Sequence, residues 1–120
     1  MEHEPKVWLL QESWSPKVDL SSANRYGAVH PILSTADQPS VAPGPSLFKL
    51  KQALRGGYHP NDYIVYALSD PATAFLAGMV FAREGLMKEP INWLRWERER
   101  DTSGQKMSGG FYVPTQIEYR

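Results

Sequence analysis

Short apolar runs alternate with longer amphipathic segments along the first two thirds of the chain. Residues 6–12 contain a continuous apolar run, Val7–Leu10, which is typical of a strand buried on both faces of a parallel sheet. Residues 28–33 and 63–68 form two more strand-like runs, and Pro31 confines the first of these to a sheet edge or a bulge. We therefore expect residues 6–12 to form a central strand.

Three helical segments are predicted around these strands. Residues 19–27 would suit a two-turn helix. After a long proline-rich loop over residues 35–46, residues 46–55 place leucines on one face and end at two consecutive glycines, which stop helices. Residues 72–84 are apolar on nearly every side. We expect this last helix to be central and packed on more than one side.

Aromatic and charged residues alternate in the last third of the chain. Residues 91–100 and 109–119 predict two strands, and the turn residues between them make the pair a hairpin. The element order β-α-β-α-β-α-β-β favours a mostly parallel sheet of about four to five strands that ends in a C-terminal antiparallel hairpin. We expect a single compact α/β domain over residues 1–120.

The composition excludes several classes of function. The 120 residues include 13 basic and 13 acidic side chains, and this zero net charge argues against a general polyanion binder. The absence of cysteine removes disulfides, thiolate metal sites and thiol catalysis. Because His3, His30 and His59 lie far apart in the sequence, no metal or other cofactor is expected. No apolar stretch is long enough to span a membrane, so we expect a soluble cytoplasmic protein.

A first candidate site is Ser69-Asp70-Pro71, which joins the clearest strand to the clearest helix. In open α/β sheets ligands bind beyond the carboxyl ends of strands, where a helix N-terminus presents free N–H groups. Ser69 and Asp70 are therefore candidate ligand-binding residues, for example for a nucleotide. The alternative is a plain helix cap, because Asp70 would repel a phosphate and no glycine-rich fingerprint is present.

Catalysis has little support in the sequence. Glu12, Asp37, Asp70 and His30 could converge at the strand ends as an acid–base set. None of the serines that follow the strands lies in a Gly-x-Ser-x-Gly elbow. The sequence thus identifies no catalytic residue and favours a protein that is not an enzyme.

The second candidate surface is the terminal hairpin together with a tryptophan near the first strand. Mixed aromatic and arginine side chains are enriched at the energetic centres of protein interfaces. The same mixture can stack bases and contact phosphates in single-stranded nucleic acid. A solvent-exposed hairpin with arginine–glutamate salt bridges is the plain alternative. The candidate partner-binding residues are Trp14, Trp93, Arg95, Trp96, Arg98, Arg100, Lys106 and Tyr112.

Four segments of the chain are idiosyncratic: residues 7–14 (VWLLQESW), 43–46 (PGPS), 92–101 (NWLRWERERD) and 109–114 (GGFYVP). Together they resemble small proteins of unknown function encoded by tailed bacteriophages. The resemblance implies a compact accessory protein that acts in the cytoplasm of an infected bacterium, commonly by binding a host or phage macromolecule. It implies no catalytic residue.

We therefore expect a protein that binds a host or phage protein stoichiometrically, as an inhibitor or modulator. Two alternatives stay open: single-stranded nucleic-acid binding through the hairpin, and nucleotide binding at Ser69-Asp70-Pro71. An unpaired edge strand could also form a homodimer with a second copy of the chain.

Overall fold

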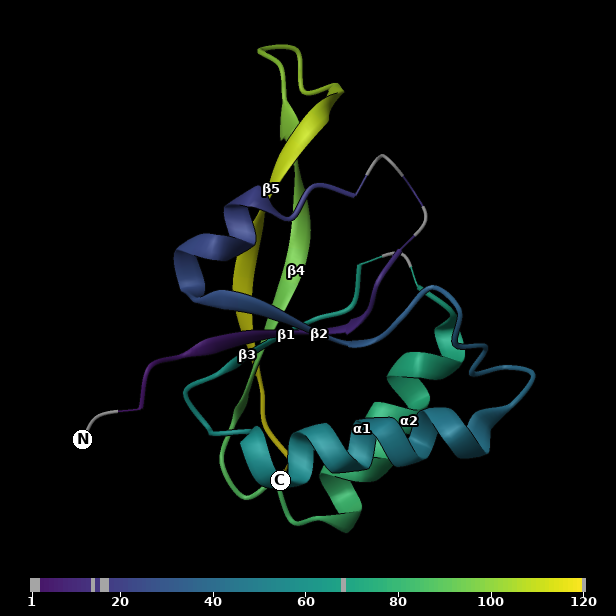
Figure 1. The fold of residues 1–120 in the computed structure, drawn as a ribbon. Coiled ribbons are helices and arrows are strands. Elements are labelled where there is room, and N and C mark those ends of the chain that lie inside the picture. The colour runs from purple at the N-terminus through teal and green to yellow at the C-terminus, as the bar shows by residue number, and fades with distance from the viewer. Residues whose placement is uncertain (1–2, 14, 16–17, 68, 120) are drawn as a thin grey trace.

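One mixed sheet organises residues 3–13, 15, 18–67 and 69–119, which are the residues that the structure, a computed structural model, describes. The five strands lie in the order β2-β1-β3-β4-β5, and Figure 1 shows β4 and β5 rising from the sheet as a long hairpin. The elements are β1 (Lys6–Gln11), the 3-10 helix η1 (Ser21–Tyr26), β2 (Ala28–Leu33), α1 (Pro43–Gly57), β3 (Tyr63–Val65), α2 (Pro71–Arg83), β4 (Ile91–Arg100) and β5 (Lys106–Ile117).

The helices cover opposite faces of this sheet. β1 pairs in parallel with β2 and β3, β3 pairs in parallel with β4, and β4 and β5 are antiparallel. The connection from β1 to β2 runs in one direction along the sheet, and the connection from β2 to β3 runs back in the other. Because both connections are right-handed, the elements within them cover opposite faces of the sheet. η1 accordingly packs on one face, and α1 and α2 pack on the other (Figure 1). The predicted α/β fold, mostly parallel with an antiparallel C-terminal hairpin, is confirmed.

β1 is buried on both faces, as its apolar run predicts. Trp8 and Leu10 pack against α1 and α2 on what we call the helix face of the sheet. Val7 and Leu9 pack against Ala23 of η1 on the opposite side, which we call the η1 face. β2 lies at the sheet edge, where a strand that contains a proline was expected.

Several predicted boundaries differ from those in the structure, and β5, for example, begins at Lys106 and not at residue 109. α1 begins at Pro43, inside the predicted loop. Proline is tolerated there because the N–H that it lacks would have no hydrogen-bond partner in the first helical turn. At its other end α1 continues through both glycines, to Gly57. The predicted helix over residues 19–27 is shorter and has 3-10 geometry, with an Ala23 N–H to Leu20 carbonyl bond of 3.0 Å. β3 ends at Val65, because Ala67 has a φ of +48° and turns the chain out of the sheet.

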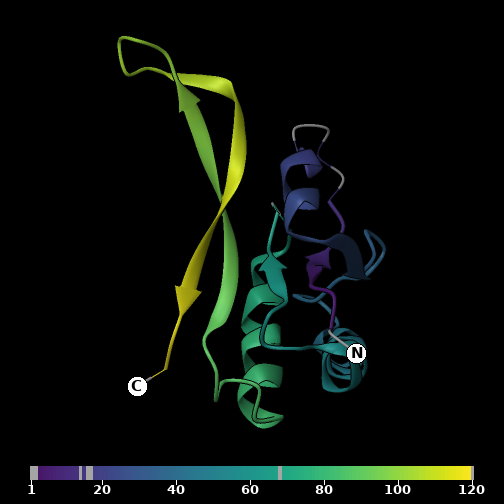
Figure 2. The same ribbon diagram turned by 90° about the vertical axis from the view of Figure 1, so that its left-hand side faces the viewer.

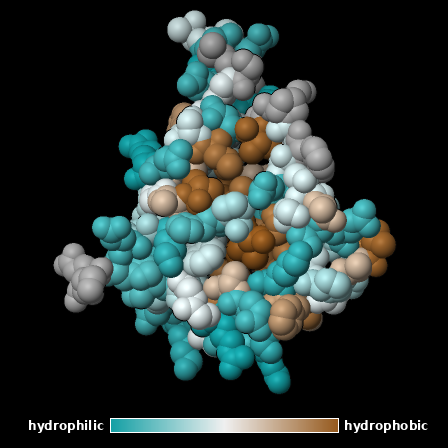
Figure 3. All heavy atoms as spheres, in the orientation of Figure 1, coloured by the Kyte–Doolittle hydropathy of each residue, from teal (hydrophilic) through white to brown (hydrophobic). Residues whose placement is uncertain are grey.

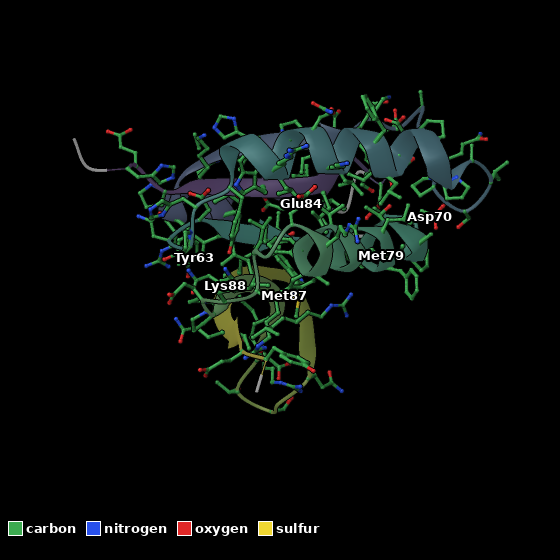
Figure 4. All side chains as sticks on the ribbon, turned by 90° about the horizontal axis from the view of Figure 1, so that it is seen from below. Tyr63, Asp70, Met79, Glu84, Met87 and Lys88 are labelled. Atoms are coloured by element: carbon green, nitrogen blue, oxygen red, sulfur yellow. The ribbon has the colours of Figure 1, made fainter. Side chains whose placement is uncertain are left out.

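α2 packs against α1 and β1, but it is not central. Its outward-facing side leaves Phe75 72% exposed and Met79 46% exposed. Figure 4 shows α1 and α2 side by side, with Asp70 at the start of α2. The prediction of a central helix is wrong, because no further helix in the described part of the chain covers this side. Neither α2 nor any other described helix is both long and apolar enough to cross a membrane.

A buried carboxylate ties the start of the chain to the turn before β3. Asp62 is fully buried and accepts four hydrogen bonds: 2.8 Å from His3 Nε2, 2.9 Å from the Lys6 N–H, 2.9 Å from Trp8 Nε1–H and 2.9 Å from the His59 N–H. Burial raises the pKa of Asp62, but these hydrogen bonds outweigh burial and leave the pKa below its ordinary value. Asp62 is therefore ionised at neutral pH.

Candidate functional site

A groove of about 790 Å³ lies beside β4 where that strand extends beyond β3. We call it the edge groove. It collects five of the eight residues that the sequence indicates as partner-binding: Trp93, Arg95, Trp96, Arg98 and Tyr112. On the face seen in Figure 3, hydrophobic side chains gather below the tip of the hairpin.

The short β3 creates the edge groove. β3 pairs with β4 only from Asn92 to Leu94, and the chain then turns away at Ala67, which lines the groove. β4 continues to Arg100 with β5 on one side, and Figure 2 shows this hairpin extending past β3. The ladder between β3 and β4 ends at Leu94, and no described residue bonds to the backbone of Trp96 or Arg98 on the side of β3. The groove follows this open edge.

Side chains from both faces of β4 reach the edge groove. Trp93 is half-buried and packs against the cluster on the helix face, and Arg95 follows it on the same face. Trp96 is half-buried against the cluster on the η1 face, and Arg98 follows it there. The structure thus brings together residues that strand alternation alone would assign to opposite surfaces.

A pair of packed aromatic rings forms part of the floor of the groove. Trp96 and Tyr112 meet edge to face with their ring centroids 5.0 Å apart. The Tyr112 side chain is buried, and burial, followed by the nearby charge of Asp19, raises its pKa. Tyr112 therefore supports the groove from beneath and is not an exposed contact residue.

Two features that the sequence did not indicate hold this floor in place. A Cβ on Gly110 would lie 2.6 Å from Cζ2 of Trp96 and 2.5 Å from the Glu97 carbonyl oxygen, so only glycine lets the indole lie this close. The Tyr112 N–H donates to Ser22 Oγ at 3.0 Å, and the Tyr26 hydroxyl donates to the Tyr112 carbonyl at 3.1 Å. The sequence held one signal for Gly110. If Trp96 pairs with Tyr112 across the hairpin, then Gly110, two positions before Tyr112, lies on the same face beside the indole.

The arginines of the hairpin differ in their surroundings. Arg95 forms an ion pair with Glu97 on the same face of β4. Arg98 is exposed and forms no ion pair with any side chain that the structure describes. Arg100 lies outside the groove and donates from Nη1 to the Gly104 carbonyl at 2.9 Å in the hairpin tip. Trp14 and the side chain of Lys106 lie outside the described parts of the chain.

The Ser69-Asp70 site lies in a second, smaller cleft of about 330 Å³ at the carboxyl ends of the parallel strands. Asp70 caps α2 by accepting from the Ala72 N–H at 3.0 Å, and it also accepts from the Ser40 N–H at 3.0 Å. Hydrogen bonds from Ser40, then from Ala72, hold the pKa of Asp70 below its ordinary value. The Ser69 hydroxyl donates to the Tyr66 carbonyl at 3.0 Å. The Asp70 carboxylate and the Ser69 hydroxyl therefore already form hydrogen bonds within the chain.

The proposed acid–base set comes together only in part. Glu12, Asp37 and Asp70 line the second cleft, whereas His30 lies on β2 with its ring 5.8 Å from that of Trp8. The Asp37 carboxylate already accepts from Lys49 Nζ at 2.6 Å and from the Ser34 N–H at 2.8 Å. Within the described ranges, no three histidine or carboxylate side chains lie close enough to hold a metal ion.

The model of a family described as Phage Pam3 gp32-like protein matches residues 5–105, which include every element from β1 to β4. No curated protein and no solved structure matches the chain.

Proposed function

Because the chain belongs to the Phage Pam3 gp32-like protein family, we propose that it is a phage accessory protein that binds a host or phage protein stoichiometrically. The edge groove is the binding surface in this proposal. Binding there would inhibit or modulate the partner without any chemical step on it.

One observation carries the proposal: the edge groove gathers two tryptophans and two arginines beside an open strand. Tryptophan and arginine are the residue types that most often dominate the energetics of protein interfaces, because each offers a large contact area together with a hydrogen-bond donor. Trp93 and Trp96 are both half-buried, so each leaves part of its surface for a partner to cover. A partner would desolvate that surface and would bring an acceptor to Arg98.

A protein partner fits this surface better than nucleic acid does. Base stacking needs open aromatic faces, but Trp96 packs against Tyr112 and the backbone of Gly110. Glu97 offsets the charge of Arg95, and the whole chain carries no net charge. Both features weaken the phosphate attraction on which single-strand binding depends.

Capture from a bacterial lysate tests the proposed function. Tagged wild-type protein should retain one protein in a near one-to-one ratio at near-physiological salt. Arg98→Glu should lose that protein, and Lys51→Glu, which makes the same charge change at an exposed position on α1, should keep it. Equal capture by both variants, or no stoichiometric partner at all, would refute the proposal. Loss of capture after nuclease treatment would instead support nucleic-acid binding.

A further inference from the structure

We propose that the edge groove binds its partner as an extended polypeptide strand that pairs with β4 and carries an apolar and an acidic side chain on the same face. This inference rests on the proposed function and adds the manner of binding. The strand would lie end to end with β3, in the position that β3 leaves empty when it ends at Val65.

The open edge of β4 supplies the main-chain partner for such a strand. Residues 95–98 pair in regular register with β5. These four residues of extended strand span about 13 Å, at roughly 3.3 Å each. The Tyr112 N–H and carbonyl bond to Ser22 and Tyr26 and not to β4, so the backbone groups of Trp96, which lies opposite Tyr112, point to the other side of β4, as do those of Arg98 two residues later. Among the described residues, nothing hydrogen-bonds to the backbone of Trp96 or Arg98 on that side. The N–H and C=O groups of Trp96 and Arg98 can hydrogen-bond to an added strand, as edge groups do wherever a peptide extends a sheet.

Because the groove is lined by residues from both faces of β4, the bound strand should lie along the edge of β4 and not flat on one face. Successive side chains of a strand point to opposite faces, so a ligand lying flat on one face meets only every second residue. The edge groove is lined by Trp93 and Arg95 from the helix face and by Trp96 and Arg98 from the η1 face. A ligand that contacts the residues of both faces must lie along the edge of β4. An extended peptide can do this because its own side chains point alternately to the two faces.

The loop that leaves β3 keeps the position open. Ala67 has a φ of +48°, which is the one positive φ at a non-glycine residue in the described part of the chain. This conformation is unfavourable for alanine, and such strained residues are concentrated at binding sites. It directs the chain away from β4 directly after Tyr66, and both residues form the wall of the groove opposite β4.

The charges and rings of the groove define the side chains that the incoming strand should carry. On the η1 face Trp96 is followed two residues later by Arg98, which has no ion-pair partner among the described side chains. An apolar residue beside Trp96 and an Asp or Glu beside Arg98 would satisfy both. The groove's carboxylate, Asp19, already accepts from the Ser21 N–H at 2.9 Å. The sequence signature is thus an apolar residue and an acidic residue separated by one position.

Selection from a surface-displayed library of random peptides, about twelve residues long, tests this inference with the full chain as bait. Selected peptides should carry an apolar and an acidic residue separated by one position, and they should bind in fluorescence anisotropy. Arg98→Glu should weaken binding about tenfold or more, whereas Lys51→Glu should leave it unchanged. Trp96→Ala should weaken binding about 30-fold, the size expected of an interface hot spot, provided that circular dichroism shows the variant folded.

Methylation of the backbone nitrogens of a selected peptide, one residue at a time, separates strand pairing from other binding. Only alternate N–H groups of the peptide point toward β4, so methylation should weaken binding at every second residue and be tolerated between them. Uniform tolerance, a three-to-four-residue period, or failure to select any peptide that depends on Arg98 would overturn the inference. If the lysate partner still depends on Arg98 in that case, the proposed function stands and only strand pairing is refuted.

Discussion

The sharpest stability prediction concerns Asp62, whose carboxylate accepts two hydrogen bonds on each oxygen. Oδ1 accepts from His3 and from the Lys6 N–H, and Oδ2 accepts from the Trp8 indole and from the His59 N–H. Asp62→Asn keeps the shape of the side chain but replaces one oxygen with an NH₂ group, which cannot accept a hydrogen bond. The better orientation points the NH₂ toward His3, because a neutral imidazole can accept, and it leaves the Lys6 N–H unpaired.

The expected loss follows from these bonds. An orphaned buried donor costs about 1–3 kcal/mol, and the bonds that survive to the amide oxygen lose the strength that an ionised acceptor gives. We expect Asp62→Asn to lower the free energy of unfolding by about 2 kcal/mol. Asp62→Ala removes all four bonds and should lower it by about 4 kcal/mol, because the donors around a vanished buried charge lose their shared partner. Either loss is large against a typical total of about 5–15 kcal/mol.

Urea denaturation followed by tryptophan fluorescence measures this loss. Asp101→Asn is the matched control: Asp101 also accepts several hydrogen bonds but is exposed in the hairpin tip, so it should change stability far less. The pKa of Asp62 is lowered from an ordinary 3.8, so its stabilisation is complete above about pH 4 and is lost as the pH falls through the native pKa. The gap between wild type and Asp62→Asn should therefore shrink in acid. Equal stability of the Asp62 and Asp101 variants at pH 7 would refute the reasoning.

Three further changes test separate parts of the fold. Tyr58→Phe should leave the melting temperature unchanged or raise it, because the buried Tyr58 hydroxyl has no hydrogen-bond partner in the described structure. Burial raises the pKa of this hydroxyl to about 12. A clear fall in the melting temperature would show that the hydroxyl has a partner. Gly110→Ala should destabilise the protein by about 1–3 kcal/mol and shift the emission of Trp96; an unchanged spectrum would show that the indole does not lie against residue 110. Asp70→Ala should speed amide hydrogen exchange at Ser40, because it removes the acceptor of the Ser40 N–H; unchanged exchange there would show that this hydrogen bond does not protect the amide.

Local patterns in the sequence were sufficient to predict most of the fold. The unbroken apolar run of β1 indicates burial on both faces, and the alternation in β4 and β5 indicates a hairpin. The composition of α2 was misleading, because an apolar residue on every side does not say how many neighbours the chain will supply. Phe75 stays exposed because the chain returns as a hairpin and not as another covering helix.

The candidate site was predictable by residue type but not by geometry. Trp93 and Trp96 are the right kinds of residue for an interface, yet alternation assigns them to opposite faces, and only the early end of β3 lets one groove reach both. That end depends on Ala67 adopting a positive φ, which alanine does not signal. Asp62 was missed for a related reason, since three of its four donors lie more than fifty positions away in the sequence.

The most direct test of the central claim, that the edge groove binds a partner protein, compares the amounts of partner that the two charge-reversal variants capture from lysate. We predict that Lys51→Glu retains as much partner as wild type does, whereas Arg98→Glu retains about a tenth or less, as expected when one side of a desolvated charge contact is reversed. Equal retention by the two variants would contradict the claim and would place the binding surface elsewhere on the molecule.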